Sequence, residues 1–179
     1  MAGILRVDQA NVDYIYAKTG GGKVYVPGHI IQIQQAIKTD VFSSSSTSYV
    51  DITGLSVTIT PVSTSSKILV ATNVKGQGNT NGTTRLMRDS TAIFLGTASG
   101  SRTVGSGGCF YGAGSPGGAG QGSNHFYVDS PSTTSTITYK IQLIVYTGGT
   151  VYINTTYNDT DATYTMRGAS SITVMEIAQ

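Results

Sequence analysis

The chain has 179 residues, a formal net charge of +2 and only 11% charged residues, less than half of the share that soluble domains usually carry. With this charge and no run of Lys or Arg, we expect no nucleic-acid partner and no attraction to an anionic membrane. No stretch has the apolar length that a membrane span requires, so we expect no membrane insertion. The single Cys109 excludes an intramolecular disulfide.

The residue types favour strands over helices. Thr, Val, Ile and Tyr are plentiful, and β-branched and aromatic side chains pack well on pleated surfaces. Glu176 is the only Glu, and straight-chain residues of this kind are the ones that favour helices. This balance excludes a helical bundle or a coiled coil and predicts an all-β protein.

Residues 1–28 differ from the rest of the chain and predict an extended N-terminal attachment arm. Three glycines at 20–22 and the pair Pro27-Gly28 interrupt this segment. An arm of this length cannot bury its apolar side chains alone, so it must lie on its own domain, on a neighbouring subunit or on a larger assembly. It lacks the basic start and long apolar run of a secretory signal, so we expect synthesis in a cytoplasm. The candidate docking residues are Ile4, Leu5, Val7, Val12, Tyr14 and Tyr16.

Residues 29–179 form a series of short apolar and polar alternations separated by turn residues, which predicts one β-domain. Asp89-Ser90 has the composition of a two-residue hairpin turn, Pro61 ends one alternation, and 43–48 is expected to be a polar loop. About eight to ten antiparallel strands at this spacing are typical of a jelly-roll or other β-sandwich. The expected strands lie at 29–37, 55–60, 67–74, 85–88, 91–95, 124–129, 137–146, 150–154 and 171–177.

A glycine-rich segment at 105–122 interrupts this series. Phe110 and Tyr111 are its only large side chains, and bare glycine backbone can approach a ligand closely. A loop of this length usually has a function, so Phe110 and Tyr111 are candidate residues for receptor or partner contact. The alternative is that they pack the loop onto the domain or at a subunit axis.

The chemistry-bearing residues are few, and they predict neither an enzyme nor a bound metal or cofactor. His29 and His125 lie in separate expected strands, where structural or surface roles are the simpler interpretation. The run 158–161 contains Asn158, Asp159 and Asp161 and resembles a Ca²⁺ loop only in its oxygen content. It lacks the glycine and the bidentate Glu of such a loop, so a solvated turn is favoured.

Seven blocks of this sequence carry a resemblance to known proteins, and they lie at 26–32, 48–61, 65–70, 86–93, 129–131, 139–142 and 167–176. They resemble a family of tailed-bacteriophage virion proteins that is abundant in marine and cyanobacterial phages and mostly described as tail-fibre or fibre-like. Together the blocks cover most of residues 26–179, and the segment 105–122 departs from the family pattern.

The resemblance implies a virion structural protein, and the charge-poor β composition agrees with it. We expect a tail-fibre or appendage subunit, a homotrimer, whose arm binds other virion proteins of the tail, adaptor or capsid. Its β-domain would contact a host-surface glycan or protein. The alternative is a capsid decoration protein or head fibre. A glycan depolymerase is less favoured, because it needs two carboxyl groups about 5 to 10 Å apart in a groove.

Overall fold

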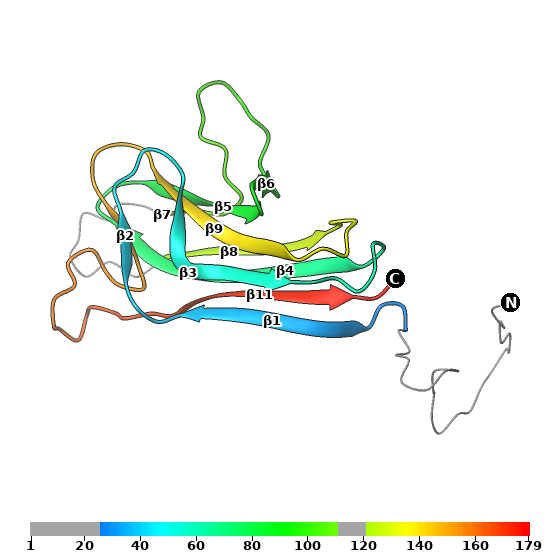
Figure 1. The fold of residues 1–179 in the computed structure, drawn as a ribbon. Helices are drawn as coiled ribbons and strands as arrows, with labels where there is room; N and C mark the ends of the chain where they lie inside the picture. Colours follow the sequence, from blue (N-terminus) through cyan, green and yellow to red (C-terminus); the bar gives the residue numbers. More distant parts are fainter. Residues whose placement is uncertain (1–25, 111–120) are drawn as a thin grey trace, which may run out of the picture.

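The computed structural model describes residues 26–110 and 121–179, which form two antiparallel sheets packed face to face (Figure 1). No helix occurs in these residues, so none of their segments is a helix suited to crossing a membrane. The strands are β1 (Ile30–Lys38), β2 (Phe42–Ser44), β3 (Val50–Ile59), β4 (Lys67–Gly78), β5 (Gly82–Arg88), β6 (Thr91–Ile93), β7 (Cys109–Phe110), β8 (Gln121–Asp129), β9 (Ile137–Val145), β10 (Val151–Ile153) and β11 (Ser170–Ile177).

The first sheet is built around the long strand β4. One edge of β4 pairs with β8. The other edge pairs first with β11 and then, toward the end of β4, with β10. Strand β1 extends the sheet beyond β11, and β2 extends it beyond β10. This six-stranded sheet therefore divides into two branches along one edge of β4.

The second sheet has five strands in the order β3-β9-β5, with β6 and β7 sharing the far edge of β5. The turn between β5 and β6 has the predicted two-residue form, because Arg88 pairs with Thr91 across it. Asp89 has a φ of 51°, the left-handed conformation that Asp tolerates better than most residues. The hairpin prediction is thus confirmed.

The order of the main strands is that of a jelly-roll. When β6 and β7 are taken as one interrupted strand and the short β2 and β10 are set aside, eight strands remain. In chain order these are β1, β3, β4, β5, β6 with β7, β8, β9 and β11. One sheet has the order β1-β11-β4-β8, which is the first, eighth, third and sixth of these strands. The other has the order β3-β9-β5 and then β6 with β7, which is the second, seventh, fourth and fifth. This is the arrangement of two interlocked Greek keys, and it confirms the predicted all-β jelly-roll sandwich.

The core lies between the sheets and is lined by every second residue of the long strands. In β9, for example, Ile137, Tyr139, Ile141, Leu143 and Val145 are buried while the residues between them are partly exposed. Period-two alternation places one set of side chains on one face of a strand. In β3 and β9 the apolar positions of the alternation are thus the core positions, whereas in β1 the apolar side chains of Ile33 and Ile37 are exposed.

A partly buried ion pair joins the two sheets at one end. Both oxygens of Asp129 on β8 lie 2.9 Å from Nη1 of Arg88 on β5, and the hydroxyl of Tyr139 on β9 donates to Asp129 at 2.7 Å. Burial of the ring and the neighbouring Asp129 carboxylate both raise the pKa of Tyr139. The phenol therefore remains a hydrogen-bond donor at all ordinary pH values.

Two short strands differ from the prediction. Strand β2 lies at the start of the segment 43–48 that was expected to be a polar loop, because Phe42 to Ser44 pair with β10 from far along the chain. The expected strand at 91–95 ends at Ile93, and the next residue, Phe94, has a φ of 55°. Both differences arise from tertiary pairing and backbone geometry that local composition does not specify.

Candidate functional site

The outer face of the six-stranded sheet carries a continuous apolar row across four strands. Ile33 on β1 pairs with Met175 on β11, Met175 pairs with Leu69 on β4, and Leu69 pairs with Val128 on β8. Ile33 and Val128 are 55% and 50% exposed, whereas Met175 and Leu69 are half-buried. Four apolar side chains from segments far apart in the sequence thus form one surface, which we call the apolar face.

A second row of the apolar face lies beside the first. Here Thr173 on β11 pairs with Ala71 on β4, and Ala71 pairs with Phe126 on β8. The Phe126 ring is 72% exposed, an unusual position for a large aromatic side chain. Contiguous exposed apolar surface of this kind marks an interaction site in a soluble protein.

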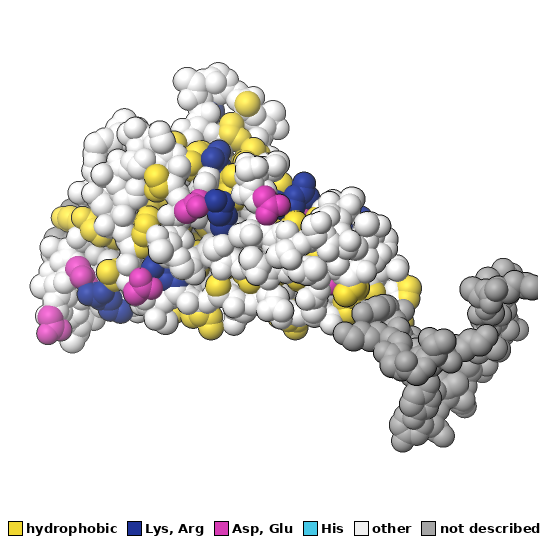
Figure 2. All heavy atoms as spheres, in the orientation of Figure 1, with side chains coloured by type: hydrophobic (Ala, Val, Ile, Leu, Met, Phe, Trp, Pro, Cys, Tyr) yellow, Lys and Arg dark blue, Asp and Glu magenta, His cyan; other side chains and the backbone are white. Residues whose placement is uncertain are grey.

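The outer face of the five-stranded sheet is polar and internally paired. Lys140 on β9 forms an ion pair with Asp51 at 2.8 Å, and the side-chain amide of Gln142 donates to the same carboxylate at 2.6 Å. Arg85 donates to Gln142 at 2.8 Å, and its guanidinium lies 3.9 Å from the centre of the Tyr49 ring. Figure 2 shows acidic and basic side chains next to one another on the face turned toward the viewer.

The electrostatics of Asp51 agree with a wet surface. Partial burial disfavours its charged form, but hydrogen bonds from Lys140 and Gln142 outweigh this effect, and the pKa of Asp51 lies below its usual value. A charged, hydrogen-bonded face of this kind is suited to solvent. The two outer faces of the sandwich therefore differ in chemistry.

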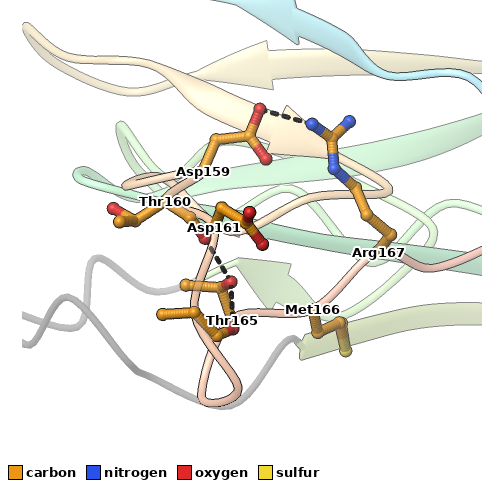
Figure 3. A pocket seen from close by; sticks show the side chains of 7 residues that line it. Asp159, Thr160, Asp161, Thr165, Met166 and Arg167 are labelled. Atoms are coloured by element: carbon orange, nitrogen blue, oxygen red, sulfur yellow. Dashed lines mark hydrogen bonds and ion pairs between the residues drawn. The ribbon is translucent and has the colours of Figure 1, made fainter.

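A polar recess lies in the loop between β10 and β11. It has a volume of about 350 Å³. Figure 3 shows Asp159 and Arg167 pointing toward each other from the two arms of the loop, and they form an ion pair at 2.7 Å. The residues that line the recess are Asp159, Thr160, Asp161, Ala162, Thr165, Met166 and Arg167.

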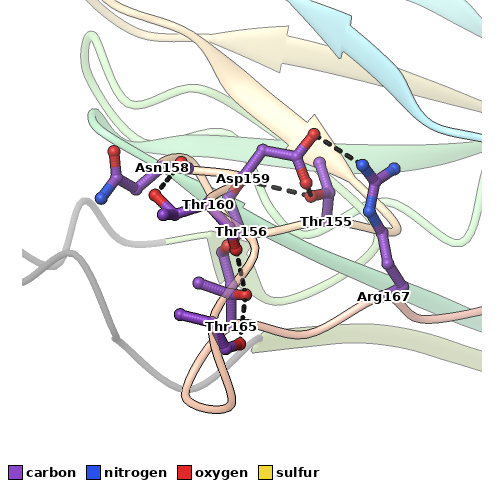
Figure 4. A network of polar contacts seen from close by, with 8 residues as sticks. Thr155, Thr156, Asn158, Asp159, Thr160, Thr165 and Arg167 are labelled. Carbon is purple, nitrogen blue, oxygen red and sulfur yellow. Dashed lines mark hydrogen bonds and ion pairs between the residues drawn. The ribbon is translucent and has the colours of Figure 1, made fainter.

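The loop around the recess is held by its own hydroxyl groups. Thr155 donates to Asp159 at 2.6 Å, and the Thr165 hydroxyl lies 2.5 Å from the carbonyl oxygen of Thr160 (Figure 4). Asp159 is thereby occupied by Arg167 and Thr155, which leaves Asp161 as the carboxylate available to a ligand. A small ligand with hydroxyl or basic groups could donate hydrogen bonds to the Asp161 carboxylate and to the threonine hydroxyl groups of the recess.

The oxygen-rich run 158–161 is a turn whose polar groups bond to one another and to Arg167. In the part of the chain that the structure describes, no three His, Cys, Asp or Glu side chains gather in a way that would hold a metal ion. The recess holds two acids, Asp159 and Asp161, and Asp159 is paired with Arg167.

A buried polar network lies between the sheets. Nδ1 of His125 is 2.6 Å from the hydroxyl of Thr72, and its Nε2 is 3.3 Å from the hydroxyl of Thr84, which in turn lies 2.7 Å from that of Ser123. Burial lowers the pKa of His125 to about 4. Gly107 packs against this network so closely that a Cβ there would collide with Ser123. Sequence alternation gave no signal for it, because its members come from three strands.

The predicted contact residues have different outcomes. The structure places Phe110 in the core with 0% exposure, packed between the sheets from β7. Its predicted role as an exposed contact is therefore corrected, and the packing alternative describes it. Its neighbour Tyr111 lies outside the described residues, as do the six arm residues Ile4, Leu5, Val7, Val12, Tyr14 and Tyr16.

The structure also describes His29, the end of the predicted arm at Gly28, and Cys109. His29 is exposed beside the start of β1, and Gly28 donates to the carbonyl of Ala178 at 2.8 Å. This bond ties the last residues of the predicted arm to the end of β11. Cys109 is exposed, with its sulfur 3.5 Å from the Tyr146 hydroxyl.

Comparisons with known proteins identify no family. No family model matches the chain, and no curated protein matches it. One solved structure that it resembles is that of infectious bursal disease virus, Gx strain, with a TM-score of 0.36 and 13% sequence identity. The match covers 93% of this chain and 43% of the viral chain, so this chain spans less than half the length of that neighbour. A likeness at this level identifies neither a family nor a function.

Proposed function

We propose that this protein is a structural subunit of a virion, specifically a tail-fibre or appendage subunit that assembles as a homotrimer. The observation that carries the proposal is the difference between the two outer faces of the sandwich. One is apolar through Ile33, Leu69 and Phe126, and the other is polar through Lys140 and Asp51. A subunit built into an assembly needs one face to bury and one to display.

The arrangement of the ends supports attachment by the arm. The first described residues and the C-terminus lie together at one end of the sandwich, and the loop between β10 and β11 lies at the opposite end (Figure 1). An arm at 1–28 would therefore anchor the domain at one end while the polar recess is displayed at the other. In this proposal the recess contacts a host-surface glycan or protein, and catalysis and cofactors are not required.

The proposal is tested by incorporation into particles. The full chain and a chain lacking residues 1–25 are produced during infection, and purified particles are probed for each. We expect the full chain in particles, and we expect the shortened chain to fold with an unchanged melting temperature but to be absent from them. Absence of the full chain from particles, or normal incorporation of the shortened one, contradicts the proposal.

Copy number in the same particles distinguishes the two virion locations. A few dozen copies or fewer is the number expected of fibres, whereas hundreds of copies would indicate a capsid decoration protein. The apolar face would then lie on the shell rather than between fibre subunits. The displayed recess has its own test, because Asp161→Asn should reduce adsorption to host cells without changing the melting temperature.

A further inference from the structure

The relief of the apolar face indicates what covers it. Phe126 is exposed on β8, and its neighbour across the sheet, Ala71, is small, whereas Thr173 beyond it accepts a hydrogen bond from the side-chain amide of Gln35 at 2.8 Å. The face therefore presents a prominent aromatic ring beside the small side chain of Ala71. A surface that carries both the ring and a place to receive one is complementary to a second copy of itself.

The charges of the apolar face point to the same occupant. The two rows across its centre contain no charged side chain among the described residues, from Ile33 to Val128 and from Thr173 to Phe126. The nearest charges on β4 are Lys67 and Lys75, which lie at the two ends of its paired segment. Two copies can meet through these two rows without burying an unpaired charge, and Lys67 and Lys75 would lie at the rim of the contact.

The size of the face is sufficient for self-association. Four strands about 4.8 Å apart, with about eight residues each at about 3.3 Å per residue, give a face of about 500 Å². Two copies would bury about 1,000 Å² together, which is the lower limit for a specific protein interface.

We propose that the apolar face binds a second copy of this chain, with Phe126 of one copy seated on Ala71 of the next. This inference rests on the proposed function and deepens it by naming the partner of the face. Every copy carries both the Phe126 side chain and the surface that receives it, so the contact can close between two copies or continue around a closed trimer. The phenyl ring of Phe126 is the anchor, since buried aromatic side chains dominate interface energetics.

The experiment is sedimentation of the full chain at micromolar concentration, with three variants. Phe126→Ser removes the ring, Ala71→Arg places a long charged side chain where the ring would be received, and Tyr164→Ser is the matched control. Tyr164 is an aromatic residue that is 60% exposed and lies on the loop between β10 and β11. We expect the wild type and Tyr164→Ser to form the same oligomer, and the two face variants to weaken it at least about tenfold. All three substituted side chains point outward, so thermal unfolding of each variant checks that the fold is kept.

Three results would overturn the inference. The first is a monomeric wild type. The second is an oligomer that Phe126→Ser and Ala71→Arg both leave intact. The third is a monomer whose face becomes accessible to hydrogen exchange only when residues 1–25 are removed, which would assign the face to the arm. A monomer that still enters particles refutes the self-association and the homotrimer but leaves the virion role standing, whereas an oligomer held by Phe126 that is absent from particles refutes only the virion role.

Discussion

Substitution of His125 should reduce the dependence of stability on pH. In the folded protein its Nδ1 lies 2.6 Å from the Thr72 hydroxyl, which also accepts the backbone N–H of His125 at 2.9 Å. This arrangement favours the neutral tautomer with the proton on Nε2, facing Thr84. A proton added to Nδ1 would leave the Thr72 hydroxyl without its acceptor. Neutral His125 is thus part of the folded structure.

The magnitude follows from the pKa. Burial lowers the pKa of His125 to about 4, whereas an unfolded chain has a histidine pKa of about 6.5. Between these values the unfolded state binds more protons than the folded state, so stability falls as the pH falls from about 6.5 toward 4. From about pH 7.5 to about pH 4.5 the expected loss from this one residue is about 2.5 kcal/mol.

The assay is urea unfolding at these two pH values for the wild type, His125→Asn and His29→Asn. His125→Asn retains a hydrogen-bonding group near Thr72 but cannot titrate, so its stability should fall by about 2.5 kcal/mol less than that of the wild type over this range. His29 is exposed and lies outside the core, and its variant is the control for the general effect of acid. Equal losses in the wild type and His125→Asn, within about 0.5 kcal/mol, would refute this account.

Phe110→Ala should destabilise the domain by about 3–5 kcal/mol, because it removes a fully buried ring; an unchanged melting temperature would return Phe110 to the surface. Tyr139→Phe should cost about 1–2 kcal/mol in urea unfolding, since it deprives Asp129 of a buried hydrogen bond, and a neutral result would mean that solvent reaches this carboxylate. Lys140→Ala should cost less than about 1 kcal/mol, because its ion pair with Asp51 lies on the exposed polar face, and a larger cost would contradict the assignment of that face to solvent.

Local sequence was sufficient for most of the strands and for the fold class. In β3, Leu55, Val57 and Ile59 are buried and the residues between them are exposed, as the alternation predicts. The turn at Asp89-Ser90 was also predicted, because its residue types match the backbone conformation that a tight hairpin requires. These features depend on a few consecutive residues, so they can be read without knowledge of the rest of the chain.

The candidate sites could not be read in this way, because they are made by pairings between distant segments. Alternation shows that Leu69 and Ala71 share one face of their strand, but it does not show which face is covered. That depends on β8 pairing with β4 from about sixty residues away, which brings Phe126 and Val128 beside them. The burial of Phe110 likewise depends on β7 pairing with β5. Composition and alternation determined that this chain forms a charge-poor β-sandwich, and only the order of strands in the tertiary structure decided which apolar side chains are enclosed and which remain on its surface.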